Sequence, residues 1–172
     1  MHPTYDFPNA PGMNPVLYKT VHRNLLKDEK IMGGAFRTDW NLHTMELRDI
    51  ETLLIWVRAL IPDAAYHLGG GAGDENRSGC GFDKTALHVH QCWGIHYNKD
   101  QYVISHNHFP YAMSFCYCVT APEGSSPLIV EDEEIDPVPG RVIFFHAHRY
   151  HSTLPNESDG RCMIVGNITY EP

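Results

Sequence analysis

The sequence predicts a mainly β protein, a double-sheet jelly roll with a supporting N-terminal helix. From about residue 86 onward, short strand-like stretches alternate with turn signals such as NKDQ, APEGSSP, DPVPG and LPNESDG, with no helical pattern between them. Parallel strands need long crossovers, usually helices, so the pattern favours an antiparallel jelly roll or small barrel. We expect strands near 86–97, 102–108, 112–120, 127–131, 141–146 and 161–170.

Length and composition indicate a single domain spanning residues 1–172, because the chain is long enough for one hydrophobic core and short for two. The 13 Lys and Arg residues against 21 Asp and Glu give a net charge of −8, which disfavours nucleic acid or an anionic membrane as partner. The N-terminus resembles no signal peptide and no stretch is apolar enough to span a membrane, so we expect a cytoplasmic protein. Its five cysteines lack CxxC spacing and are expected to be free thiols.

One helix is expected before the strands, over residues 45–60. Apolar residues recur there every three or four positions, at Leu47, Ile50, Leu54, Val57 and Ile61. Thr44 is the expected N-cap, and Pro62 is expected to stop the helix. Residues 1–30, rich in Pro and Asn, predict an extended arm, and the glycine-rich stretch 68–83 predicts a mobile loop that could cover a site.

Histidine is unusually frequent, with 12 copies. Three pairs have strand spacing: His88 with His90, His106 with His108, and His146 with His148. Alternate strand residues point to one side, so a pair can chelate one divalent metal through its imidazoles. Two ligands are too few for a metal site, and the downstream segment, which also contains His151, must supply another. His88 and His90 are expected to form a polar layer or bind substrate, with at least one of them structural.

Two segments resemble the Fe(II)- and 2-oxoglutarate-dependent oxygenases, most closely a small branch of the superfamily met in bacteria and phages. They are CWGIHYNKDQYVISHNHFPYAMSFCYCVTAPEGSSPLIV and PVPGRVIFFHAHRYHSTLPNESDGRCMIVGNITY, and the resemblance covers residues of about 91–170. The residues that carry it are Trp93, Tyr97, His106, His108, Pro110, Tyr117, Gly140, Phe145, His151, Arg161 and Asn167.

The resemblance implies a double-stranded β-helix, the jelly roll also found in cupins, with Fe(II) and 2-oxoglutarate as cofactors. It implies that the metal ligands are His106, His108 and His151. Arg161 would bind the far carboxylate of 2-oxoglutarate, because a guanidinium grips a carboxylate through two parallel bonds. Tyr97, Tyr117 and Asn167 would be further cofactor-binding residues. The implied reaction converts 2-oxoglutarate to succinate and CO2 while a small molecule or peptide is hydroxylated.

One position departs from the family pattern. The usual triad has two histidines and one carboxylate, and here His108 stands at the position of the carboxylate. His108 could ligate directly, Glu131 or Asp132 could supply a carboxylate instead, or a water or anion could fill the position. His146 and His148 compete with His151 as the distal ligand.

Two other classes of function remain open. The first is a cupin-type metal protein or a dioxygenase that does not use 2-oxoglutarate. Such a protein would not need Arg161, although cupins usually carry a Glu soon after the histidine pair and HNHFPYAMSFC has none. The second is a non-enzymatic jelly-roll binding protein without a tight metal. In either case Arg161 could be a surface residue paired with Glu157 or Asp159.

Overall fold

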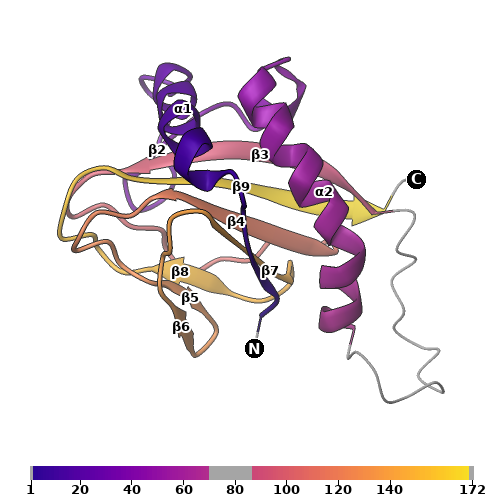
Figure 1. Cartoon of the computed structure of the whole chain (residues 1–172). Helices are drawn as coiled ribbons and strands as arrows, with labels where there is room; N and C mark the ends of the chain where they lie inside the picture. Colours follow the sequence, from indigo (N-terminus) through magenta and orange to yellow (C-terminus); the bar gives the residue numbers. More distant parts are fainter. Residues whose placement is uncertain (1, 70–86, 171–172) are drawn as a thin grey trace.

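The computed structural model describes residues 2–69 and 87–170, so the glycine-rich stretch at 68–83 lies almost wholly outside the described residues. The protein is mainly β and forms a jelly roll. In the described part, a six-stranded sheet stands opposite a three-stranded sheet, and two α-helices cover the outer face of the larger sheet (Figure 1).

All strand pairs are antiparallel, and except for the β5–β6 hairpin they join segments that are distant in the sequence. In spatial order the larger sheet contains β1 (Thr4–Asp6), β7 (Arg141–His146), β4 (Met113–Thr120), β9 (Arg161–Tyr170), β3 (Leu87–Tyr97) and β2 (Phe36–Arg37). The smaller sheet contains β6 (Glu133–Ile135), β5 (Leu128–Val130) and β8 (His151–Thr153). The helices are α1 (Ala10–Arg23), the short 3-10 helix η1 (Leu42–Thr44) and α2 (Arg48–Leu68).

Five of the six expected strands are present, with ends that differ by no more than a residue or so, but the strand predicted at 102–108 is not a regular strand. This segment takes part only in isolated bridges. Its backbone donors bond to a loop and to a side chain: the Ile104 N–H donates to the Met32 carbonyl at 3.2 Å, and the Val103 N–H donates to Thr153 Oγ1 at 2.9 Å. The segment thus lies beside β8, with a single bridge between His106 and His151, and does not form a continuous ladder with it.

The extended arm expected at residues 1–30 is wrong, because helix α1 occupies Ala10–Arg23. Pro11 lies in the first turn, where a missing N–H costs nothing. A buried stripe then recurs at helical spacing, at Ala10, Asn14, Leu17 and Val21. The stripe is visible in the sequence, but the prolines and asparagines around it disguise it.

The helix expected at 45–60 is present as α2 but is displaced toward the C-terminus. Thr44 lies in η1, and the N-cap position is Leu47. Pro62 does not end the helix, because its ring removes a single backbone hydrogen bond while Ala64 and Ala65 beyond it are buried against the protein. No helix in residues 2–69 and 87–170 is long and apolar enough to span a membrane.

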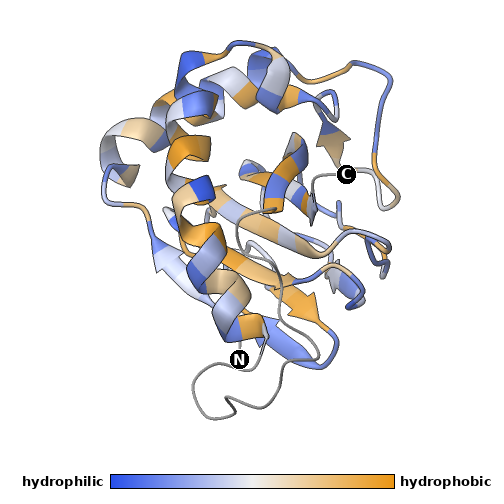
Figure 2. Ribbon diagram, turned by 90° about the vertical axis from the view of Figure 1, so that its right-hand side faces the viewer, coloured by the Kyte–Doolittle hydropathy of each residue, from blue (hydrophilic) through white to orange (hydrophobic). Residues whose placement is uncertain are grey.

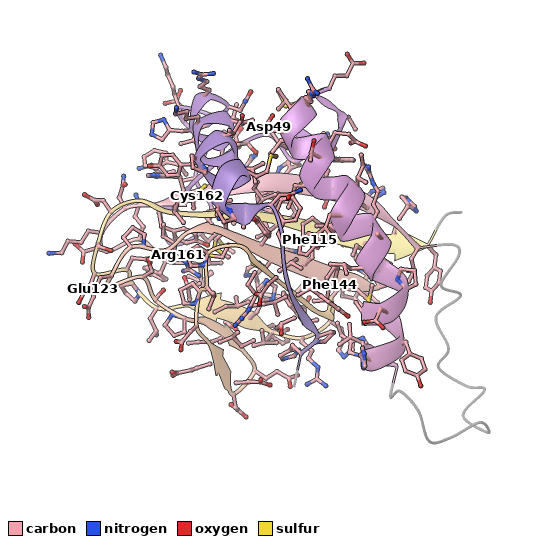
Figure 3. All side chains as sticks on the ribbon, viewed as in Figure 1. Asp49, Phe115, Glu123, Phe144, Arg161 and Cys162 are labelled. Carbon is pink, nitrogen blue, oxygen red and sulfur yellow. The ribbon has the colours of Figure 1, made fainter. Side chains whose placement is uncertain are left out.

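The larger sheet separates two hydrophobic layers, since alternate residues of a strand point to opposite faces. Along β4, Phe115 packs in the layer beneath the helices and Cys116 packs in the layer between the sheets. The neighbours Arg161 and Cys162 likewise lie on opposite sides of β9 (Figure 3). Hydrophobic residues concentrate along these strands and alternate with hydrophilic ones along α2 (Figure 2). The four cysteines in the described ranges are buried free thiols, as expected.

Gly166 allows the closest approach within the larger sheet and gives a stability prediction. A Cβ at this position would lie under 3.0 Å from the Gln91 carbonyl oxygen and from the Phe115 ring. Gly166→Ala is expected to lower the free energy of unfolding by about 2 kcal/mol, the usual cost of overpacking a core. Gly12→Ala in α1, where a Cβ meets nothing within 4 Å, is the matched control and should be neutral or slightly stabilising. Equal urea midpoints for the two variants would contradict this prediction.

Candidate metal centre and cofactor pocket

Three histidines converge in the layer between the two sheets: His106, His108 and His151. One ring nitrogen from each lies within 4.8 Å of the others. The ring centroids are 4.9 Å apart for His106 and His108, 4.3 Å for His106 and His151, and 4.9 Å for His108 and His151. Neighbouring nitrogens around one metal lie about 3.0–3.4 Å apart at bonds of ~2.1 Å, so modest side-chain rotations would close the triad on an ion.

Backbone pairing fixes this convergence. The His106 N–H donates to the His151 carbonyl at 3.1 Å, and the His151 N–H returns the bond to the His106 carbonyl at 2.8 Å. Two residues later, the His108 N–H donates to the Ala147 carbonyl at 2.7 Å. The HNH spacing places both upstream histidines on one side of the extended segment, and the pairing places the downstream histidine beside them.

Two of the rings are held in the tautomer that a metal ligand needs. His106 Nδ1 donates to the Ile104 carbonyl at 2.8 Å, and His151 Nδ1 donates to the Arg149 carbonyl at 3.2 Å. A ring that carries its proton on Nδ1 has a lone pair on Nε2, the other nitrogen. Both rings can therefore offer Nε2 to a metal.

Burial keeps two histidines of the triad, His108 and His151, neutral. It lowers the pKa of His108 to about 4, with His106 as a second cause, and lowers the pKa of His151 to about 3, with His106 and His108 as further causes. Neutral imidazole is the form that binds a metal. At neutral pH both rings are in that form.

The triad opens into a cavity of about 340 Å³ between the sheets. Its walls include Trp40, Trp93 and Tyr97, and its cationic lining residues are Lys30 and Arg37. No Asp or Glu contributes to its lining among the described residues, although the chain carries 21 of them. The volume suits a small co-substrate with part of a second substrate.

Arg161 does not line the cavity itself but lies against Tyr97, a lining residue, and its surroundings point to a bound anion. The side chain is only 1% exposed. Its guanidinium lies 4.8 Å from the centre of the Tyr97 ring, and Nη1 donates to Ser126 Oγ at 3.2 Å. Its Nε has no hydrogen-bond partner, and no carboxylate of residues 2–69 or 87–170 forms an ion pair with it.

The surface pairing of Arg161 with Glu157 or Asp159 is therefore wrong. Asp159 instead accepts a bond from the Lys99 N–H at 2.7 Å. A buried guanidinium without a carboxylate partner is costly unless a ligand supplies the anion. The site thus fits 2-oxoglutarate, whose far carboxylate would satisfy the fork of Arg161.

The other three expected cofactor-binding residues lie in three different places. Tyr97 lines the cavity, and burial raises the pKa of its phenol. Tyr117 is buried on the opposite face of the sheet, in the layer beneath the helices, where its hydroxyl donates to Asn14 Oδ1 at 2.5 Å. The structure therefore does not bring Tyr117 to the pocket. Asn167 lies beside His108 rather than Arg161, six residues and about 20 Å along β9 from the arginine.

The alternative metal ligands lie elsewhere. Glu131 forms an ion pair with Arg149, and the neighbouring Asp132 is exposed. His146 Nε2 contacts the Leu68 carbonyl at 3.2 Å, and its ring stacks on that of exposed His148. Among the described residues, no Asp or Glu side chain joins the three converging histidines.

His88 and His90 lie near the start of β3, away from the triad. Their ring centroids are 6.0 Å apart, and the His90 ring packs against Tyr111. This placement suits the structural role that was expected for at least one of them.

Several residues around the candidate site could not be predicted from the sequence. They are Ser126 beside Arg161, Gln91 and Ser114 beside Asn167, and the cavity-lining residues Lys30, Ile31, Met32, Arg37 and Trp40. Ser126 lies in the turn signal APEGSSP, and the cavity-lining residues at positions 30–40 precede the segment that carried the resemblance. Only the folded sheet brings these residues to the cavity or to the side chains of Arg161 and Asn167.

Comparisons with known proteins agree with this architecture. A search with the sequence matches no family model and no curated protein. The structure is similar to a viral collagen prolyl hydroxylase from Paramecium Bursaria Chlorella virus-1 in complex with 2OG (TM-score 0.71, 16% identity, 97% of this chain and 94% of that one).

Two further solved structures span different reactions. A prolyl hydroxylase from Trichoplax adhaerens, in complex with a peptide of hypoxia inducible factor, has a TM-score of 0.57 at 13% identity and matches 96% of this chain and 82% of its own. The α-ketoglutarate-dependent epimerase SnoN of nogalamycin biosynthesis has a TM-score of 0.64 at 14% identity and matches 98% and 81%. The fold is thus the one found in 2-oxoglutarate- and Fe(II)-dependent oxygenases, and the histidine triad can hold a metal.

Proposed function

We propose that this protein is an iron- and 2-oxoglutarate-dependent dioxygenase that hydroxylates a small molecule or a peptide. Its metal ligands are three histidines: His106, His108 and His151. Arg161 binds the far carboxylate of 2-oxoglutarate, and Tyr97 lies against that guanidinium as a second cofactor contact. Iron with 2-oxoglutarate supplies the oxidising chemistry, and the chain binds, orients and excludes water around it.

The observation that carries the proposal is the burial of Arg161 next to a cavity that also contains the triad. A cupin-type metal protein has no use for a buried guanidinium that lacks an anionic partner. A jelly-roll protein without a metal has no use for three buried imidazoles whose nitrogens converge. Bound iron and 2-oxoglutarate would account for both, since the triad would hold the metal and Arg161 would pair with the far carboxylate.

The substrate of the proposed reaction enters beside Trp40 and Trp93, whose rings pack edge to face at 4.8 Å. Ile31 and Met32 line the same cavity. These apolar walls suit a hydrophobic side chain of a peptide or a small molecule of similar size. The peptide complex of the Trichoplax adhaerens neighbour supports the peptide alternative.

The proposal is tested by anaerobic titration of the metal-free protein with Fe(II) and then with 2-oxoglutarate. We expect one iron per chain and a visible charge-transfer band that appears only after the second addition. Exposure to oxygen should then yield succinate, even without the second substrate. Iron binding without the band would favour the cupin-type alternative, and absence of metal binding would favour the non-enzymatic one.

A further inference from the structure

A row of polar side chains crosses three neighbouring strands at the end of the cavity that holds His108. Asn167 on β9 is in register with Gln91 on β3 and with Ser114 on β4. Ser114 Oγ lies 2.9 Å from Asn167 Oδ1, and Asn167 Nδ2 lies 3.1 Å from Gln91 Oε1. Asn167 is only 1% exposed, and its buried amide is held on both sides by these two contacts.

The same amide reaches the third metal ligand. Asn167 Nδ2 lies 3.5 Å from His108 Nδ1. His106 and His151 face backbone carbonyls with their Nδ1 atoms, and a carbonyl can only accept. His108 is therefore the one ligand of the triad whose Nδ1 faces a group that can either donate or accept.

This difference matters because the tautomer of a neutral histidine decides which nitrogen can bind a metal. If the Asn167 amide nitrogen donates to His108 Nδ1, the ring proton lies on Nε2, and Nε2 cannot be a ligand. If the amide is turned over, its oxygen accepts the proton of Nδ1 and Nε2 holds a lone pair. Ser114 can donate or accept, and the Gln91 amide can turn in the same way, so both arrangements keep the row hydrogen-bonded.

We propose that Asn167, held by Gln91 and Ser114, is the positioning residue that sets the tautomer of His108 and so decides whether this histidine becomes the third metal ligand. The inference rests on the metal centre proposed above. It gives Asn167 a role at the metal rather than at 2-oxoglutarate. A partner for the second ring nitrogen commonly changes the metal affinity of a histidine site by 10- to 100-fold.

The direct test is the ring-nitrogen NMR spectrum of protein labelled with 15N-histidine, recorded at pH 7.5 with and without Zn(II). In Asn167→Asp the carboxylate can only accept, so His108 should carry its proton on Nδ1 even before zinc is added. In Asn167→Leu that acceptor is gone, and His108 should be a mixture of tautomers or hold its proton on Nε2. On addition of zinc, the wild-type His108 should move fully to the Nδ1–H form.

Zinc affinity, measured by competition with a chromophoric chelator, gives the second readout. Asn167→Leu should bind zinc about 10- to 100-fold more weakly than wild type, and Asn167→Asp should bind it at least as tightly. Asn14→Leu is the matched control, because Asn14 is also a buried amide but bonds to Tyr117 and to the Val119 carbonyl. It should lower stability and leave zinc affinity unchanged.

The outcomes separate this inference from the function on which it rests. If the tautomer of His108 is the same in wild type, Asn167→Asp and Asn167→Leu, the positioning role is overturned, whatever the metal does. An equal loss of zinc affinity in both Asn167 variants also overturns it, because the acceptor would then be irrelevant. If the tautomer shifts as expected but wild type binds neither zinc nor Fe(II), the metal centre fails and Asn167 still controls the ring.

Discussion

Arg161→Met is expected to weaken 2-oxoglutarate binding by about 30-fold or more while metal binding survives. The guanidinium is buried, and the loss of one partner of a buried charge pair costs about 2 kcal/mol or more. Methionine keeps much of the apolar stem that packs near Tyr97, so the fold should persist. Calorimetric titration of 2-oxoglutarate into Mn(II)-loaded protein without oxygen measures the 2-oxoglutarate affinity. Titration of Mn(II) into the metal-free protein measures the metal affinity.

Arg58→Met is the control for Arg161. Arg58 is a surface residue of α2 that pairs with Glu51, far from the cavity. Its loss should change neither 2-oxoglutarate affinity nor metal affinity, since exposed ion pairs contribute little. If Arg161→Met binds 2-oxoglutarate as tightly as wild type, the buried guanidinium serves another anion, and the cofactor assignment must be abandoned.

The second large effect is expected at His108. His108→Ala should lose at least about 100-fold in Fe(II) affinity, because it removes a whole ligand and the loss of a supporting residue alone costs 10- to 100-fold. His108→Asp installs the carboxylate that is usual in the family that this sequence resembles. It should recover most of the lost Fe(II) affinity. Both are measured by anaerobic iron titration, with the 2-oxoglutarate charge-transfer band as a second signal.

His148→Ala is the matched control for His108, because His148 is exposed and stacks on His146 outside the triad. It should leave iron affinity unchanged. If His108→Ala keeps both the affinity and the band, the third ligand comes from elsewhere. Glu131→Gln and Asp132→Asn would then be the next variants, although neither side chain lies at the triad here.

Local sequence pattern determined the parts of the fold that depend on neighbours in the chain. The apolar repeat from Leu47 to Ile61 predicted α2, and the turn signals placed five of the strands close to their true ends. The prediction was wrong where tertiary contacts outweighed local preference. Pro62 lies inside α2 because burial beyond it compensates for one lost hydrogen bond, and Asn14 lies in α1 because its amide bonds to Tyr117 and Val119.

The candidate site also has a part that could be predicted from the sequence and a part that could not. The sequence alone indicated His106, His108, His151 and Arg161, because strand spacing and the resemblance apply to residues within one continuous segment. The tertiary structure decided the rest: that Tyr117 faces the helices, that Glu131 is paired with Arg149, and that Gln91 and Ser114 lie beside Asn167. The physical reason is the jelly-roll topology, since the face of a strand follows from its own sequence but its neighbours follow from pairing across the whole chain.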